Sequence, residues 1–321
     1  MRFNIRHVTR FDYEAPISES VMEARMQPRS DGLQRCLHFS LNTSPASRVM
    51  LYQDHDGNTV HHFNVPGRHS HLTLTAQALV ECSPAASSQD TISPDAWDEL
   101  DARSEAGEWW DLLAPSRFAE TTDALSKFAR AIGLGRANDP LTTLRDLMGT
   151  MYRHFEYSPQ STRVDSRIDE ALHARRGVCQ DFSHIFIALA RQLGVPTRYV
   201  SGYLFRDVTA ADRSSEDATH AWAEALIPGA GWIGFDPTNN LIAGARHIRV
   251  AIGRDYADVP PTRGIYKGIS AVRSELAVAV RVGPVQQPEV VDVVPFTPWM
   301  SRDASLPMRD AEAEQQQQQQ Q

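Results

Sequence analysis

The chain has 321 residues, of which 41% are hydrophobic, and carries a formal net charge of -8 at pH 7. This length allows one large domain or two ordinary domains with hydrophobic cores. The acidic balance and the lack of a basic run argue against a nucleic-acid partner, because phosphate binding needs clustered lysine and arginine.

The N-terminus has no apolar run of signal-peptide length, and no segment approaches the roughly 18 apolar residues of a membrane span. We therefore expect no membrane partner. The three cysteines, Cys36, Cys82 and Cys179, are too few and odd in number for a disulfide framework. They favour a reducing, cytoplasmic location, in which a free thiol is available for chemistry.

Residues 1–83 are predicted to form an N-terminal β-sandwich. Short segments alternate between apolar and polar residues, and turn signals such as Pro66-Gly67 separate them. The predicted strands are residues 6–13, 37–43, 47–54, 58–65 and 71–82. Residues 84–118 are acidic and rich in serine, which predicts a linker with one short helix.

Residues 119–295 combine helical and strand patterns, which predicts an α+β core. Apolar residues recur at helical spacing in 124–134 and 140–157, and Asp139-Pro140 suits the start of the second helix. A third helix is predicted over 179–193. Strands are predicted over 197–206, 219–227, 231–238, 247–253 and 275–282. Residues 296–321 end in seven glutamines and are predicted to be disordered.

Cys179 is placed where a nucleophilic cysteine is expected. Gly177 allows a tight turn two residues earlier, and the predicted helix begins at or just after the cysteine. Free backbone N–H groups and the helix dipole would stabilise a thiolate there, and the same N–H groups could hold an oxyanion. The alternative is a small buried apolar residue, the usual role of a single free cysteine.

His220 and Asp236 are expected to lie close together on a hairpin. The segment 219–227 runs into Pro-Gly-Ala-Gly and returns as 231–238. A turn near 229–230 pairs His220 with about residue 239 and Asp236 with about residue 223, one diagonal step apart. The carboxylate could then hold the imidazole and fix its tautomer. Taken singly, each residue is as readily explained as a strand histidine or a turn aspartate.

Two segments carry a resemblance to a known family. RRGVCQDFSHIFIALARQLGVPTRYVSGYL and DATHAWAEALIPGAGWIGFDPTNN resemble the core of the bacterial transglutaminase-like proteins. The resemblance implies a papain-like, transglutaminase-like core after an N-terminal β-sandwich, and a triad of Cys179, His220 and Asp236. It implies acyl transfer on a peptide or protein amide, with no cofactor and no metal.

Gln180 follows the cysteine where animal transglutaminases have tryptophan, and paired acidic clusters for calcium are not evident. Hydrolysis, as in a cysteine peptidase or amidase, is therefore the first expectation. The alternatives are a transamidase that forms isopeptide bonds and a non-catalytic transglutaminase-like binding scaffold. A further alternative is an unrelated protein in which Cys179 is only part of the core.

Three further residues are weaker candidates for the site. Tyr157 could donate to an oxyanion, Gln180 could line the cleft, and Trp222 could shield the triad from water. Each has a structural alternative: a core aromatic, a solvent-facing polar residue and a core tryptophan. The histidines of the first 83 residues are dense, but no cysteine or carboxylate completes a zinc-site spacing.

Overall fold

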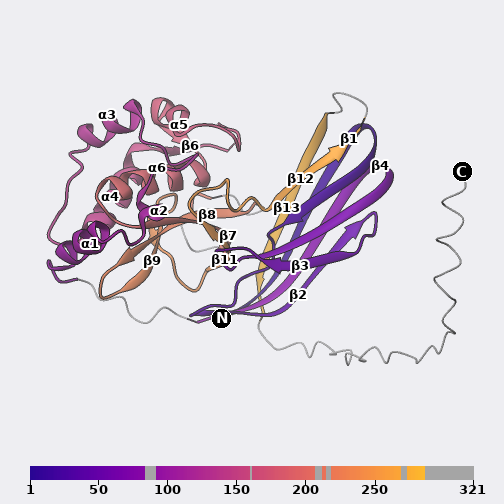
Figure 1. Ribbon diagram of the computed structural model, residues 1–321, viewed down its shortest axis with the longest axis horizontal. Coiled ribbons are helices and arrows are strands. Elements are labelled where there is room, and N and C mark those ends of the chain that lie inside the picture. Colours follow the sequence, from indigo (N-terminus) through magenta and orange to yellow (C-terminus); the bar gives the residue numbers. More distant parts are fainter. Residues whose placement is uncertain (84–91, 160, 207–211, 215–217, 269–272, 286–321) are drawn as a thin grey trace, which may run out of the picture. The chain divides into compact units, whose positions relative to one another are not determined.

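The structure is a computed structural model that describes residues 1–83, 92–159, 161–206, 212–214, 218–268 and 273–285. These residues form two antiparallel sheets, a two-stranded parallel sheet and a set of helices (Figure 1). The predicted disordered tail, 296–321, and the first part of the predicted linker lie outside the described residues. No helix in the described part of the chain is long and apolar enough to cross a membrane.

The larger sheet has six strands and contains the strand-rich N-terminal region. Hydrogen bonds connect its strands in the order β12-β1-β4-β2, while β13 pairs with β1 and β3 pairs with β4. The strands are β1 (Arg2–Ala24), β2 (Gln34–Ser44), β3 (Val49–Gln53), β4 (Thr59–Cys82), β12 (Thr262–Lys267) and β13 (Ser274–Pro284).

Strand β4 runs through Pro66-Gly67, although the dipeptide is a turn signal that predicts a break between two strands. Instead, the register against β1 shifts here: His69 pairs with Ile17, and Pro66 pairs with Glu19. Gly67 has a φ of 91°, a left-handed conformation that glycine adopts without a side-chain penalty. The dipeptide therefore marks an irregularity within one long strand and not a chain reversal.

Strands β12 and β13 complete the larger sheet, although residues 262–284 lie within the predicted core range of 119–295. β13 pairs with the first half of β1 and β12 with its second half. The larger sheet thus takes strands from the N-terminal region and from residues beyond the core sheet. The strand pattern of 275–282 was recognised, but alternation shows only that a segment is a strand and not which partner it has.

The smaller sheet forms the centre of the predicted core. Its strand order is β10-β9-β8-β7-β11, and all pairs are antiparallel. Helix α6 (Cys179–Gln192) packs on β7 and β8. Ala221, Ala223 and Ala225 of β8 belong to the same buried cluster as this helix, and their small side chains allow a close approach. The strands are β7 (Thr197–Leu204), β8 (His220–Ile227), β9 (Gly231–Asp236), β10 (Leu241–Ile242) and β11 (His247–Gly253).

Five further helices accompany α6, and α2, α3, α4 and α5 contact it. The helices are α1 (Ala96–Glu105), α2 (Trp110–Leu113), α3 (Asp123–Ala131), α4 (Pro140–His154) and α5 (Ile168–Ala174). Asp139 accepts a hydrogen bond from the Thr142 amide at 2.8 Å and caps α4, as its sequence predicts. Trp97 and Leu100 of α1 are buried in the core cluster, so the described part of the predicted linker packs into the core.

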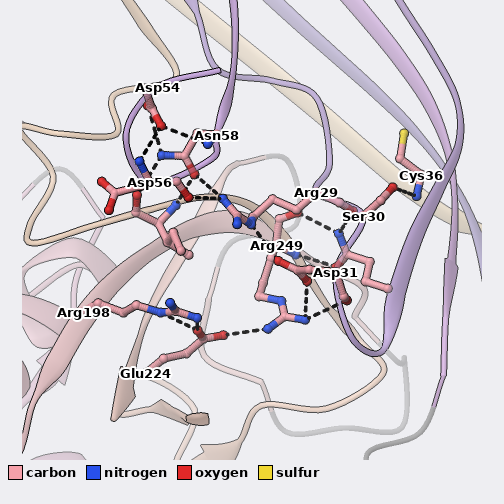
Figure 2. Close-up of polar contacts among 12 residues, drawn as sticks. Arg29, Ser30, Asp31, Cys36, Asp54, Asp56, Asn58, Arg198, Glu224 and Arg249 are labelled. Atoms are coloured by element: carbon pink, nitrogen blue, oxygen red, sulfur yellow. Dashed lines mark hydrogen bonds and ion pairs between the residues drawn. The ribbon is translucent and has the colours of Figure 1, made fainter. Parts of the chain in front are cut away.

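A chain of ion pairs joins β11 and β8 to the segment between β1 and β2 (Figure 2). Arg249 on β11 lies 2.7 Å from Asp31 and 3.4 Å from Glu224, and Glu224 also pairs with Arg198 at 2.7 Å. The Glu224 side chain is buried, and each of its carboxylate oxygens has an arginine partner. Pairing of this kind is what a buried charge requires.

Candidate active site

Helix α6 begins at Cys179, and a buried carboxylate fixes this start. Asp181 accepts hydrogen bonds from the Val178 amide at 2.8 Å and from the Thr162 hydroxyl at 2.6 Å. A Cβ atom at Gly177 would lie 2.8 Å from Asp181 Oδ2, so only glycine leaves room for this cap. The Cys179 side chain is partly exposed at the helix N-terminus, where backbone N–H groups are free of intrahelical partners.

The β8–β9 hairpin brings His220 and Asp236 together. Ala223 pairs with Phe235, so the register differs by one residue from the predicted one. His220 Nε2 lies 2.7 Å from Asp236 Oδ2, and both side chains are buried. A bond of this length between an imidazole N–H and a carboxylate orients the ring.

Asp236 is held by the backbone and side chains that follow it. Its Oδ1 accepts from the amides of Thr238 at 3.0 Å and Asn239 at 3.2 Å, while Oδ2 also accepts from the Asn239 side-chain amide at 2.8 Å. Burial alone would raise the pKa of Asp236, but the charge and hydrogen bond of His220, and the hydrogen bond of His247, lower it well below its ordinary value. Asp236 is therefore a carboxylate at neutral pH.

His220 is held as an imidazolium. Burial opposes its protonation, but the charge and hydrogen bond of Asp236, with a further contribution from Cys179, raise its pKa to about 10. Nδ1 is buried and makes no hydrogen bond of standard geometry to the described residues. With Nε2 committed to Asp236, Nδ1 is the nitrogen left for Cys179.

His247, the first residue of β11, also belongs to this cluster, although it is not among the site residues predicted from the sequence. Its Nδ1 accepts from the Gly244 amide at 3.3 Å, so Nε2 carries the proton and donates to Asp236 Oδ2 at 3.1 Å. Burial, the largest influence, lowers the pKa of His247, although Asp236 acts in the opposite direction. His247 is thus a neutral donor to the carboxylate that also holds His220.

The three weaker candidates occupy different positions. Trp222 is fully buried, and its ring lies 6.0 Å from that of His220 in a stacked arrangement. The Gln180 amide donates to the Val164 carbonyl at 3.0 Å, which ties the helix start to a neighbouring loop. Tyr157 is half-buried in β5 (Glu156–Tyr157), where it pairs with Gly177 of β6 (Arg176–Gly177). Its contribution to an oxyanion site stays a prediction.

The other two cysteines differ from Cys179 in their surroundings. Burial raises the pKa of Cys82 to about 11. Burial also raises the pKa of Cys36, against a hydrogen bond to the His38 carbonyl. Neither thiol is therefore expected to ionise readily near neutral pH.

One group of three side chains in the described part of the chain has metal-ligand spacing, namely His220, Asp236 and His247. These side chains already satisfy one another, at 2.7 and 3.1 Å, with hydrogen bonds that a metal ion would have to replace. Of the N-terminal histidines, His69 hydrogen-bonds with Ser20 at 2.8 Å and with the Gly67 carbonyl at 2.9 Å.

The fold and this cluster indicate a protein of the transglutaminase-like type, and comparisons with known proteins agree. Residues 127–237 match the model of the transglutaminase-like superfamily, and residues 3–81 match that of the bacterial transglutaminase-like N-terminal region. An uncharacterized protein of Mycobacterium leprae is 33% identical over 87% of this chain and 98% of its own length. An uncharacterized protein of Mycobacterium tuberculosis is 36% identical over 89% of this chain and 93% of its own length.

The crystal structure of a candidate cysteine protease from Cytophaga hutchinsonii has a TM-score of 0.68 to this chain. It shares 22% identity and covers 89% of this chain and 92% of its own, which shows a common fold. The chain therefore belongs to the transglutaminase-like superfamily and carries the N-terminal region of its bacterial members. The predicted family and fold class are confirmed.

Proposed function

We propose that this protein is a thiol-dependent hydrolase that cleaves an amide or peptide bond through Cys179, His220 and Asp236. The observation that carries the proposal is the state of His220, whose Nε2 is bonded to Asp236 at 2.7 Å while Nδ1 has no hydrogen bond of standard geometry to the described residues. An imidazolium at this position would stabilise a thiolate on Cys179 and could later donate its proton.

In the first step, the Cys179 sulfur adds to the carbonyl carbon of the substrate, and the carbonyl oxygen becomes an oxyanion. The free N–H groups at the start of α6 adjoin Cys179 in the sequence, and they are our candidate donors to that oxygen. The intermediate then collapses, the C–N bond breaks, and the departing amine takes the proton from His220 Nδ1. The product is an acyl-thioester on Cys179.

In the second step, His220 takes a proton from a water molecule, whose oxygen adds to the thioester carbonyl. The carbon–sulfur bond breaks, which releases the carboxylic acid and restores the thiolate–imidazolium pair. If an amine took the place of water, the same steps would form an isopeptide bond. Transamidation is therefore the alternative outcome of the same site, and a scaffold without turnover is the alternative from another class.

The proposal is tested by the rate at which iodoacetamide labels each cysteine, measured by peptide mass spectrometry between pH 5 and 9. We expect Cys179 to react near pH 6, well ahead of Cys36 and Cys82, and His220→Ala to remove this selectivity. Labelling of Cys179 that depends on pH like an ordinary thiol, and that ignores His220→Ala, would contradict the proposal.

Turnover separates the enzyme from the scaffold. Peptide or protein amides are screened as substrates with the native protein and with Cys179→Ala, and free carboxylate distinguishes hydrolysis from amine incorporation. The same measurements with and without EDTA address the cluster of His220, Asp236 and His247, because a required metal ion would make activity sensitive to the chelator. We also propose a cytoplasmic location, which cell fractionation would test.

A further inference from the structure

A groove of about 630 Å³ lies along β5, whose partner strand β6 leads into the candidate active-site helix. It is formed by the end of α4, by β5 and by Arg175 and Arg213. Tyr157 of β5 lines the groove and pairs with Gly177 of β6, two residues before Cys179. The groove and the candidate nucleophile are thus connected through adjacent backbone segments.

The groove is positively charged in a chain whose formal net charge is -8. Arg153, Arg175 and Arg213 line it, against the single carboxylate of Glu156. None of these three arginines forms an ion pair with the described residues, whereas Glu224, Asp212 and Asp101 elsewhere each have an arginine partner. Unpaired guanidinium groups in a concave site favour an anionic ligand.

The guanidinium groups keep N–H donors available for such a ligand. Arg213 Nη1 donates to the carbonyl oxygens of Tyr152 at 3.0 Å and Phe155 at 3.2 Å, and its guanidinium lies over the Tyr152 ring, 3.4 Å from the ring centre; Nε and Nη2 have no hydrogen-bond partner among the described residues. Arg175 lies over the ring of Phe128, 4.4 Å from its centre. Complementing the end of α4 accounts for Arg153 and for Nη1 of Arg213, but not for Arg175, which follows α5 and has no hydrogen bond to α4 among the described residues.

Arg213 is also linked to the catalytic cluster. Its backbone amide donates to the Asn239 side chain at 2.7 Å, and the amide group of Asn239 donates to Asp236 at 2.8 Å. Asn239 therefore hydrogen-bonds both to the backbone of Arg213, which lines the groove, and to Asp236, the candidate orienting carboxylate.

Arg175 occupies a backbone position that suits glycine. Its φ is 54°, in the left-handed region, at the end of α5 and directly before β6. Glycine adopts this conformation without penalty and is common at helix ends, whereas most other residues are strained there. A large cation at such a position is consistent with a role for its side chain.

We propose that this groove binds a carboxylate of the substrate, so that the preferred substrates are amides with a carboxylate a few bonds from the scissile carbonyl. The inference rests on the proposed function of Cys179 and adds a substrate class to it. The carboxylate would be recognised by charge and by the free guanidinium N–H groups, and its binding would place the amide beside the sulfur.

The test compares two alkylating reagents of similar size, neutral iodoacetamide and anionic iodoacetate, on Cys179. The ratio of the iodoacetate rate to the iodoacetamide rate cancels the fraction of thiolate and reports the local potential. We expect Arg175→Gln and Arg153→Gln each to lower this ratio by about threefold at low ionic strength. Added salt should lower the ratio for the native protein.

Arg176→Gln is the matched control. Arg176 is exposed and closer to Cys179 in sequence, but it does not line the groove, so its loss should change the ratio much less. Arg175→Gly removes the same charge while favouring the left-handed backbone, which guards against misfolding of Arg175→Gln. Arg213 is not varied, because it also satisfies the last carbonyls of α4.

The two proposals fail in different ways. An unchanged ratio in the Arg175 and Arg153 variants, or an equal loss in Arg176→Gln, would overturn the carboxylate site even if iodoacetamide labelling stays fast and dependent on His220. Slow iodoacetamide labelling of the native protein would instead count against the triad, and the ratio would still be measurable.

Discussion

Nε2 of His247 donates to Oδ2 of Asp236 at 3.1 Å, and this is the oxygen that His220 also contacts. His247 therefore helps to fix the carboxylate that orients His220. Replacing it with phenylalanine would remove the donor while keeping a ring of similar size. We expect this change to slow iodoacetamide labelling of Cys179 several-fold at pH 7, on the order of one lost hydrogen bond to a charged group.

His247→Gln is the matched control for that change, because the glutamine amide can donate from nearly the same position as Nε2. Labelling should recover most of its native rate and its native pH profile. Equal loss in the glutamine and phenylalanine variants would indicate that His247 matters only for packing around Trp222, whose ring centre lies 5.2 Å away.

Asp236→Asn tests the charge that keeps His220 protonated. The pKa of His220 is raised to about 10 because the charge of Asp236 outweighs burial, so without this charge burial should lower the pKa and leave the imidazole neutral. We expect turnover to fall by about 10²-fold or more. Labelling of Cys179 at pH 6 should then slow towards the rates of Cys36 and Cys82. A native labelling profile in this variant would contradict the assigned role.

The hairpin that carries His220 and Asp236 could be predicted to within one residue. The Pro-Gly-Ala-Gly turn fixes where two short strands reverse, and antiparallel pairing then determines which residues face each other. The start of α6 at Cys179 was also predictable, because Gly177 precedes it and the apolar residues at helical spacing follow it. Both features depend on contacts between residues close in sequence.

The missed features depend on contacts between distant segments. The alternation of β11 predicts a strand. It does not predict that this strand pairs with β7 or that His247 contacts Asp236. The same holds for β13: its alternation predicts a strand, but it does not predict pairing with the first half of β1. The three arginines of the groove lie on three separate segments and share no sequence motif.

Gly177→Ala is expected to disturb the presentation of Cys179. The new Cβ would lie 2.8 Å from Asp181 Oδ2 and 3.0 Å from Asp181 Cβ, so the carboxylate must leave the Val178 amide. Loss of such a cap costs about 1 kcal/mol in the free energy of unfolding. Labelling of Cys179 should slow as well. Gly135→Ala, whose Cβ would meet nothing closer than 3.9 Å, should change neither quantity, and similar effects in both variants would contradict this explanation.

His184 gives the fold a defined sensitivity to acid. The side chain is buried between Phe118 and Tyr199, and its Nε2 accepts from the Tyr256 amide at 3.2 Å, so the folded protein requires the neutral ring. Burial lowers its pKa to about 3, although Asp255 acts in the opposite direction. The unfolded chain, with a histidine pKa near 6.5, binds the extra proton between these values.

Stability from this residue is therefore fully present above pH 6.5 and is lost as the pH falls towards 3. Between pH 7 and pH 5 the loss amounts to about 2 kcal/mol in the free energy of unfolding. His184→Gln keeps an acceptor for the Tyr256 amide but does not titrate. Between pH 7 and pH 5, the free energy of unfolding of this variant should therefore fall by about 2 kcal/mol less than that of the native protein. Urea unfolding at the two pH values measures the difference, and His173→Gln on the exposed face of α5 serves as the control. An unaltered pH dependence in His184→Gln would show that His184 is not the group that titrates on unfolding.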